Sequence, residues 1–130
     1  MMLYVDTSAF IKPFTGEPEA GPMAEALEEH ADDLVSSLLL DVEASRIAGR
    51  VGGDAPALIV EALAGVRRVQ IGLEIVRAAA QVLPGSGLGT LDAIHLATAL
   101  ALPEPPLVAT YDRRLQDACR AVGLRVLAPA

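Results

Sequence analysis

Four acidic residues far apart in the sequence are candidates for a shared site: Asp6, Glu43, Asp92 and Asp112. Each stands among apolar residues, unlike the acids concentrated between positions 17 and 33. Asp6 and Asp112 come just after short aliphatic runs typical of buried strands, and Asp92 lies in the first turn of an apolar helical stretch. Because parallel strands end at one edge of a sheet, we expect these three acids to meet there. Glu43 joins them if its helix crosses that edge.

The chemistry that four such acids support is metal-assisted. Carboxylates held close together repel one another, so a cation or bound protons must neutralise them. Oxygen ligands, with no cysteine cluster and little histidine, select Mg²⁺ or Mn²⁺ over Zn²⁺. Such an ion keeps several waters and completes its shell with phosphate oxygens, which makes hydrolysis of a phosphodiester the natural reaction.

Each acid also has a simpler structural interpretation. Asp6, Asp92 and Asp112 suit a helix cap or first turn, where backbone N–H groups and the helix dipole favour negative charge. Glu43 could be a solvated helix residue. Asp41 projects from the other side of the same predicted helix and is assigned to the surface. Only the combination of four acids favours the metal site.

The elements that must position these acids alternate between strands and helices. Strands are predicted at 3–5, 34–36, 68–71, 107–110 and 125–127. Helical segments are predicted at 8–12, 19–30, 38–51, 55–64, 73–82, 90–102 and 112–122. Ser37, Asp54, Thr90 and Asp112 are the expected helix caps. This alternation predicts an α/β fold with a mostly parallel sheet and right-handed crossovers.

Length and composition limit the class of protein. The 130 residues predict a single domain over 1–130, without an internal repeat or linker. The net charge of −7 argues against a basic surface that coats nucleic acid. Cys119 is the only cysteine, which excludes an internal disulfide, and it is expected to be a buried helix residue. No apolar run is long enough for a membrane span, and no basic N-terminal leader is present, so a cytoplasmic protein without membrane contact is expected.

An ordered set of motifs resembles the PIN-domain family, and within it the VapC-type toxins of toxin–antitoxin pairs. The residues that carry the resemblance are 3–9 (LYVDTSA), 36–43 (SSLLLDVE), 92–99 (DAIHLATA) and 110–115 (TYDRRL). The resemblance extends from residue 2 to residue 129. No single motif is specific, whereas the order and spacing of the set are.

The resemblance implies a three-layer α/β/α sandwich and a Mg²⁺-dependent endoribonuclease that is the toxin of a type II toxin–antitoxin system. The four acids would be its catalytic metal ligands, with the hydroxyls of Ser8 and Thr110 close to them. A homodimer, an RNA substrate and a cognate antitoxin are the implied partners. Pro13 and Phe14 depart from the family pattern in the first loop.

Other residues receive secondary assignments. Arg46, Arg113 and Lys12 are candidates for contacts with RNA phosphate, or for ion pairs with nearby acids. His95 lies three residues after Asp92 and is expected to be a helix-packing residue, with a role as general base or metal ligand as the minor alternative.

Two alternative functions fit the residues less well. One is a phosphoryl-transfer domain with a nucleophilic aspartate, either a response-regulator receiver or a haloacid-dehalogenase-like phosphatase. The phosphatase needs a second Asp where Ser8 stands, and both domains need a lysine late in the chain, whereas Lys12 is the only lysine. The other alternative is a catalytically weak PIN-like module that binds RNA or an antitoxin, and the presence of all four acids argues against it.

Overall fold

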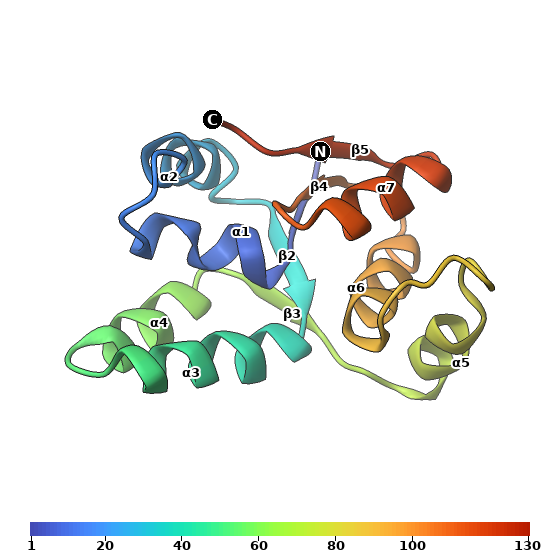
Figure 1. Cartoon of the computed structure of the whole chain (residues 1–130), viewed down its shortest axis with the longest axis horizontal. Helices are drawn as coiled ribbons and strands as arrows, with labels where there is room; N and C mark the ends of the chain where they lie inside the picture. Colours follow the sequence, from blue (N-terminus) through green and yellow to red (C-terminus); the bar gives the residue numbers. More distant parts are fainter.

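In the computed structural model, which describes residues 1–130, five short strands form one parallel sheet (Figure 1). The strands are β1 (Leu3–Val5), β2 (Leu34–Ser37), β3 (Arg67–Val69), β4 (Leu107–Ala109) and β5 (Arg125–Leu127). Their order across the sheet is β3-β2-β1-β4-β5, so β1 is central and β3 and β5 are the edges. Every neighbouring pair is parallel, which confirms the predicted type of sheet.

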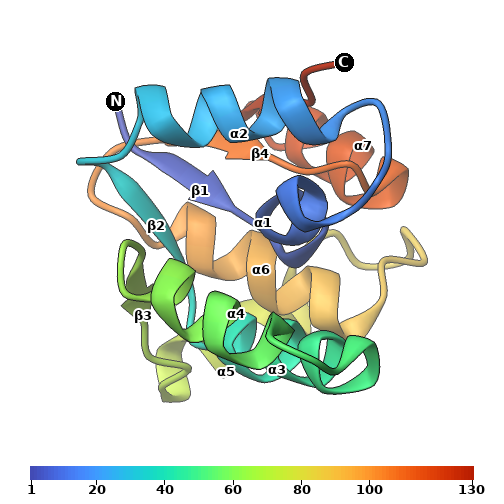
Figure 2. The same cartoon turned by 90° about the vertical axis from the view of Figure 1, so that its left-hand side faces the viewer.

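Seven α-helices and one short 3₁₀ helix connect the strands and cover both faces of the sheet (Figure 1, Figure 2). They are α1 (Thr7–Ile11), η1 (Lys12–Phe14), α2 (Ala20–Glu29), α3 (Leu39–Val51), α4 (Ala55–Leu63), α5 (Leu73–Gln81), α6 (Thr90–Leu100) and α7 (Arg113–Ala121). The three-layer α/β/α architecture expected from the sequence is therefore present.

Alternation along β1 separates two hydrophobic cores. Leu3 and Val5 are fully buried in one core, together with residues from α1, α2, α3 and α4. Tyr4, between them, is fully buried in the other core, with residues from α6 and α7. Successive side chains of a strand point to opposite faces, so three residues of the central strand anchor both helical layers. Asp6 is the next residue in the chain, so the packing of β1 into both cores fixes its position.

The helix starts agree with the sequence to within one or two residues, but two expected caps are wrong. Gly89, not Thr90, is the N-cap of α6, and Thr90 is the first helical residue. Leu38, not Ser37, is the N-cap of α3, although the Ser37 hydroxyl accepts a hydrogen bond from the Leu39 backbone N–H at 3.1 Å. Asp54 stands at the N-cap of α4 as predicted, without a side-chain capping hydrogen bond, and Asp112 caps α7 with its side chain.

Two further expectations concern single features of the chain. Cys119 is fully buried in α7, and burial raises the pKa of its thiol to about 11, so the thiol stays protonated. None of the helices has both the length and the apolar character needed to cross a bilayer.

Candidate active site

Asp6 lies at the C-terminal end of β1 and is almost completely buried. Its Oδ1 accepts hydrogen bonds from the Ser8 hydroxyl at 2.8 Å and from the Ala9 backbone N–H at 3.0 Å. Its Oδ2 accepts a bond from the Thr110 hydroxyl at 2.6 Å. Burial raises the pKa of Asp6, although these three hydrogen bonds act in the opposite direction. The carboxylate is thus a helix cap and also a buried charge with a fixed orientation.

Two hydroxyl groups join the turn after β1 to the turn after β4. The Ser8 oxygen accepts a hydrogen bond from the Tyr111 backbone N–H at 2.9 Å, and the Thr110 oxygen accepts one from the Asp112 N–H at 3.1 Å. Each hydroxyl then donates to Asp6. The two turns therefore form one hydrogen-bonded unit that positions Asp6 and Asp112 relative to each other.

Glu43 reaches the same edge of the sheet from α3. Its Oε1 accepts a hydrogen bond from the Thr7 hydroxyl at 2.7 Å and lies 2.9 Å from Nε2 of His95 on α6. Burial alone would raise the pKa of Glu43, but the hydrogen bonds from His95 and Thr7 outweigh it and hold the pKa below its ordinary value. Asp41 points away from this edge, as expected, but it is partly buried and lies 3.5 Å from Arg68 on the edge strand rather than fully exposed.

Asp92 and Asp112 complete the set at the starts of α6 and α7. Asp112 caps α7, with Oδ1 accepting bonds from the backbone N–H groups of Arg114 at 2.9 Å and Leu115 at 3.3 Å. Asp92, in the first turn of α6, forms no side-chain hydrogen bond within the chain. Burial raises the pKa of Asp92, and the negative charges of Asp112, Asp6 and Glu43 raise it further. The charges of Asp6, Glu43 and Asp112 are therefore all close enough to affect the ionisation of Asp92.

The four acids do not form a finished coordination shell. No three acidic, histidine or cysteine side chains stand close enough together to hold a metal ion as they are arranged. The donor set nevertheless fits a hard divalent cation, since it consists of carboxylate oxygens whose mutual repulsion such a cation would relieve. The oxygens without a hydrogen-bond partner are those of Asp92, Oε2 of Glu43 and Oδ2 of Asp112. These oxygens are free to turn toward an ion, and Oδ2 of Asp6 accepts only one hydrogen bond and so keeps a second lone pair for an ion.

Comparison with known proteins places this arrangement in a family. The PIN domain family matches residues 3–121, which is most of the chain. The chain belongs to the PIN-domain family. Ribonuclease VapC35 from Mycobacterium tuberculosis (strain CDC 1551 / Oshkosh) is 37% identical over 132 residues, covering 98% of this chain and 97% of that protein. Ribonuclease VapC46 from strain ATCC 25618 / H37Rv is 35% identical, covering 98% of each chain. The VapC-type resemblance is thereby confirmed.

A solved structure shares the fold of this PIN domain. A chain of a toxin–antitoxin complex from Klebsiella pneumoniae superposes with a TM-score of 0.76, covering 100% of this chain and 98% of that one. Its sequence identity of 23% is low. Similarity at this level concerns the fold, so the α/β/α sandwich is shared and the chemistry must be argued from the residues.

The basic residues of this PIN domain differ in their freedom to bind an anion. Arg46 and Arg113 are exposed and have no hydrogen bond or ion pair within the chain. Lys12 is largely buried, 3.1 Å from Glu17, and its Nζ lies 4.7 Å from the centre of the Tyr111 ring. Of the three proposed phosphate contacts, Lys12 already has partners inside the molecule. Arg114, which was not among them, is also exposed, in the first turn of α7.

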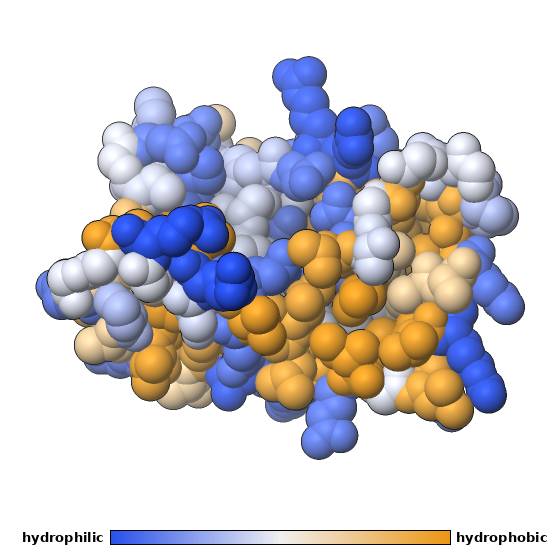
Figure 3. Space-filling view, turned by 60° about the horizontal axis from the view of Figure 1, so that its bottom comes forward, coloured by the Kyte–Doolittle hydropathy of each residue, from blue (hydrophilic) through white to orange (hydrophobic).

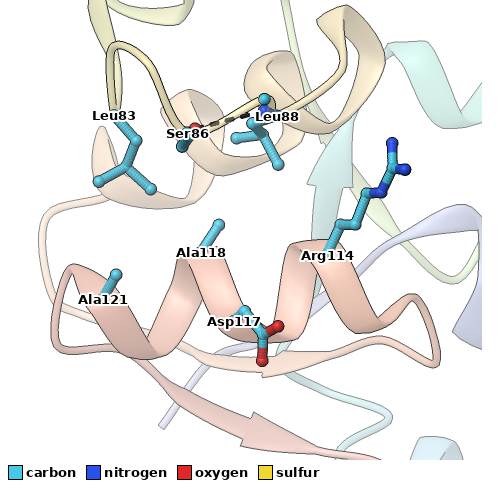
Figure 4. Close-up of a pocket in the computed structure, with 8 residues that line it drawn as sticks. Leu83, Ser86, Leu88, Arg114, Asp117, Ala118 and Ala121 are labelled. Carbon is cyan, nitrogen blue, oxygen red and sulfur yellow. Dashed lines mark hydrogen bonds between the residues drawn. The ribbon is translucent and has the colours of Figure 1, made fainter.

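A hollow of about 450 Å³ lies between α7 and the loop that precedes α6 (Figure 4). Leu83 and Leu88 of the loop face Ala118 and Ala121 of the helix across it, and Arg114 stands at one end. None of the four acids lines this hollow. This hollow is therefore separate from the candidate site of the four acids.

Replacement of Thr110 by valine tests the link between the two turns. Valine keeps the shape of threonine but leaves Oδ2 of the buried Asp6 and the Asp112 N–H without the hydroxyl. A buried polar group that loses its partner costs about 1–3 kcal/mol, so Thr110→Val is expected to lower the free energy of unfolding by that amount. Urea unfolding measures it. Thr110→Ser, which keeps the hydroxyl, should lose less, and an equal loss would contradict the role of the hydrogen bonds.

Proposed function

We propose that this PIN domain is a Mg²⁺-dependent endoribonuclease that acts as the toxin of a type II toxin–antitoxin system. The observation that carries the proposal is the proximity of the four acids: burial raises the pKa of Asp92, and the negative charges of Asp112, Asp6 and Glu43 raise it further. Relatives over nearly the whole chain are named ribonucleases, which supports RNA as the substrate.

Asp6, Glu43, Asp92 and Asp112 would hold the metal, as the catalytic ligands proposed from the sequence. A bound Mg²⁺ or Mn²⁺ would supply a water of lowered pKa and would stabilise negative charge on the leaving oxygen of the phosphodiester. The chain itself contributes orientation. Ser8 and Thr110 fix Asp6, and the cap of α7 fixes Asp112. Arg46 and Arg113, which are exposed and unpaired, would bind phosphates of the RNA backbone.

The acidic net charge is compatible with an RNA substrate. Four of the negative charges belong to the cluster that a divalent cation would neutralise. Affinity for arbitrary RNA should then be weak and dependent on the metal, because few basic groups contribute to backbone binding. Selection would come from the shape of the RNA, such as a single-stranded loop.

The alternative is a catalytically weak PIN-like module that binds RNA or an antitoxin. Incubation of the purified protein with structured RNA, in Mg²⁺ and in EDTA, separates the two functions. Cleavage in Mg²⁺ that stops in EDTA supports the enzyme, and RNA that stays intact in both favours the binding module. Sequencing of the RNA ends produced on expression would identify the target.

A homodimer is the proposed assembly. Apolar side chains gather on the face of the molecule that carries α3 and α5 (Figure 3). The exposed aliphatic residues of these two helices and the residues beside them are Leu38, Val42, Val51, Leu73, Val76 and Leu91. A contiguous apolar patch on a protein in water is typical of an interaction surface. We assign it to a second copy of this chain.

A charge placed in this patch should break the dimer. Val76 on α5 is 49% exposed, so glutamate at this position is tolerated in the monomer but would be desolvated in an interface. Val76→Glu is therefore expected to shift the protein from dimer to monomer in sedimentation experiments. Glu74→Gln, which changes an exposed charge two residues away on the same helix, serves as the control. A dimer that persists in Val76→Glu would place the interface elsewhere.

An antitoxin is the second proposed partner. An apolar hollow of about 230 Å³ lies between α1, α3 and α4, and Phe14 from the divergent first loop forms part of its wall. It would accept an apolar segment of the antitoxin, so the loop around Pro13 would influence the choice of partner. With RNA as substrate and no membrane partner, the proposed location is the cytoplasm.

A further inference from the structure

The buried side chain of His95 has a polar partner at each ring nitrogen. Nε2 lies 2.9 Å from Oε1 of Glu43, and Nδ1 lies 2.7 Å from the hydroxyl of Tyr4. The rings of Tyr4 and His95 meet edge to face, with centroids 5.8 Å apart and planes at 79°. A chain of hydrogen bonds thus runs from the central strand β1, through α6, to Glu43 on α3. The packing role expected for His95 is incomplete, because packing alone requires neither polar contact.

The partners of His95 indicate the direction of each hydrogen bond. A tyrosine phenol ordinarily keeps its proton at neutral pH, so at 2.7 Å the Tyr4 hydroxyl donates to Nδ1. A neutral imidazole whose Nδ1 accepts carries its proton on Nε2. Nε2 then donates to Glu43, whose carboxylate only accepts. Tyr4 therefore selects the tautomer in which His95 is a donor to Glu43.

The hydrogen bonds to Glu43 leave one of its oxygens free. His95 and Thr7 both donate to Oε1, from α6 and α1 respectively. Oε2 has no partner within the chain. A glutamate side chain has several rotatable bonds, and two donors from different helices restrict it to one orientation. The restricted carboxylate keeps Oε2 available for a ligand from outside the chain.

We propose that Tyr4 and His95 are positioning residues that hold Glu43 oriented for the divalent cation of the acid cluster. This inference rests on the proposed function, because it assumes that a metal binds there. Partners that orient a metal ligand typically change metal affinity or activity by about 10–100-fold when they are removed. An apolar residue at position 95 would pack equally well but would leave Glu43 with Thr7 alone.

Metal affinity measured by calorimetry with Mn²⁺ tests the proposal without depending on RNA cleavage. His95→Leu removes the donor and is expected to weaken Mn²⁺ binding by about 10–100-fold. His95→Gln, whose amide nitrogen can still donate to Glu43, should recover most of that affinity. Leu96→Val is the control for packing, because Leu96 is buried in the same helix and has no polar side-chain group that could bond to Tyr4 or Glu43. Thermal unfolding verifies that each variant is folded.

Nitrogen NMR tests the role of Tyr4 in the protein without metal. The chain has two histidines, so the His95 signals are assigned by their loss in His95→Gln. In the wild type, Nε2 should be protonated and Nδ1 should not be. Tyr4→Phe is expected to shift the ring toward a mixture of tautomers, and to weaken Mn²⁺ binding less than His95→Leu does.

The outcomes separate this inference from the proposed function. A wild-type protein that cleaves RNA and binds Mn²⁺, together with a His95→Leu variant of equal Mn²⁺ affinity, overturns the positioning role alone. A tautomer that is unchanged in Tyr4→Phe overturns the part assigned to Tyr4. A folded wild-type protein that binds no Mn²⁺ and cleaves no RNA overturns both proposals.

Discussion

Asp6→Asn should abolish RNA cleavage while the protein stays folded. The substitution removes one negative charge from the proposed metal site and keeps the size of the side chain. Loss of a direct ligand should cost more than loss of an orienting partner, so we expect cleavage to fall by at least about 100-fold. The measurement is the initial rate of cleavage of a structured RNA in Mg²⁺, with growth arrest on expression as the cellular counterpart.

The surroundings of Asp6 explain why the variant should fold. The asparagine carbonyl can still accept the hydrogen bond from the Ala9 N–H, and its amide can donate to Thr110 once that hydroxyl turns. Burial also raises the pKa of Asp6, so removal of its charge relieves a cost in the folded state. Asp32→Asn, at an exposed position, is the control for charge alone. Equal cleavage by wild type and Asp6→Asn would rule out the proposed mechanism.

Asp92→Asn should have opposite effects on activity and on stability. We expect loss of cleavage of about 100-fold, as for any direct ligand, but a protein that is more stable than the wild type in EDTA at pH 7. Burial raises the pKa of Asp92 and three neighbouring acids raise it further, so the folded state favours its neutral form. Asparagine is neutral at every pH and avoids the repulsion. Because Asp92 is partly exposed, solvent screening should limit the gain to about 2–4 °C in Tm.

The pH dependence of this gain follows from the sign of the shift. A carboxyl whose pKa is raised by folding contributes stability below its unfolded pKa, near 4, and loses that contribution as the pH rises through the folded pKa. The advantage of Asp92→Asn should therefore shrink as the pH falls from 7 toward 4. Thermal unfolding in EDTA across this range measures it. A constant difference at all pH values would show that Asp92 is not destabilised by its neighbours.

Addition of Mn²⁺ provides a further check on the same pair of proteins. A ligand that binds only the folded state raises stability in proportion to the logarithm of its concentration above the dissociation constant. The wild type should gain more than Asp92→Asn. The lead of Asp92→Asn in melting temperature should therefore shrink as Mn²⁺ is added. An identical gain in both proteins would place the metal away from Asp92.

The positions of the acids could be predicted because strand ends leave a clear pattern in the sequence. Asp6 and Asp112 each follow an aliphatic run, and the parallel sheet brings both runs side by side, as β1 and β4. Ser8 and Thr110 were expected near the acids only from the family resemblance, and the structure gives each a hydrogen bond to Asp6. Their role as metal-site residues stays a prediction.

The partners of Glu43 could not be predicted in the same way. The contact between His95 and Glu43 joins α6 to α3, and it depends on how these two helices approach each other across the end of the sheet. Spacing within one helix carries no information on that approach. The same holds for Thr7, whose hydroxyl donates to Glu43, 36 positions further along the chain. The one available signal was the presence of polar residues, Tyr4 and His95, within strongly apolar segments.

The two misplaced caps, Thr90 and Ser37, have a local cause. Both belong to residue types that cap helices well, and each lies one position from the actual N-cap. The cap and the first helical residue differ by one position, and the loop conformation that precedes the helix decides between them. In α6 the extended backbone at Gly89 takes the capping position.

The order of the strands affects when the protein can become active during its own synthesis. β1 is made first, but one of its two neighbours in the sheet is β4, which lies in the last quarter of the chain. Until β4 leaves the ribosome, Asp6 lacks the Thr110 hydroxyl and the site lacks Asp112. A nascent chain therefore contains Asp6 before it contains the residues that would complete the site. For the proposed ribonuclease, this order of assembly would protect the messenger until the protein is nearly complete.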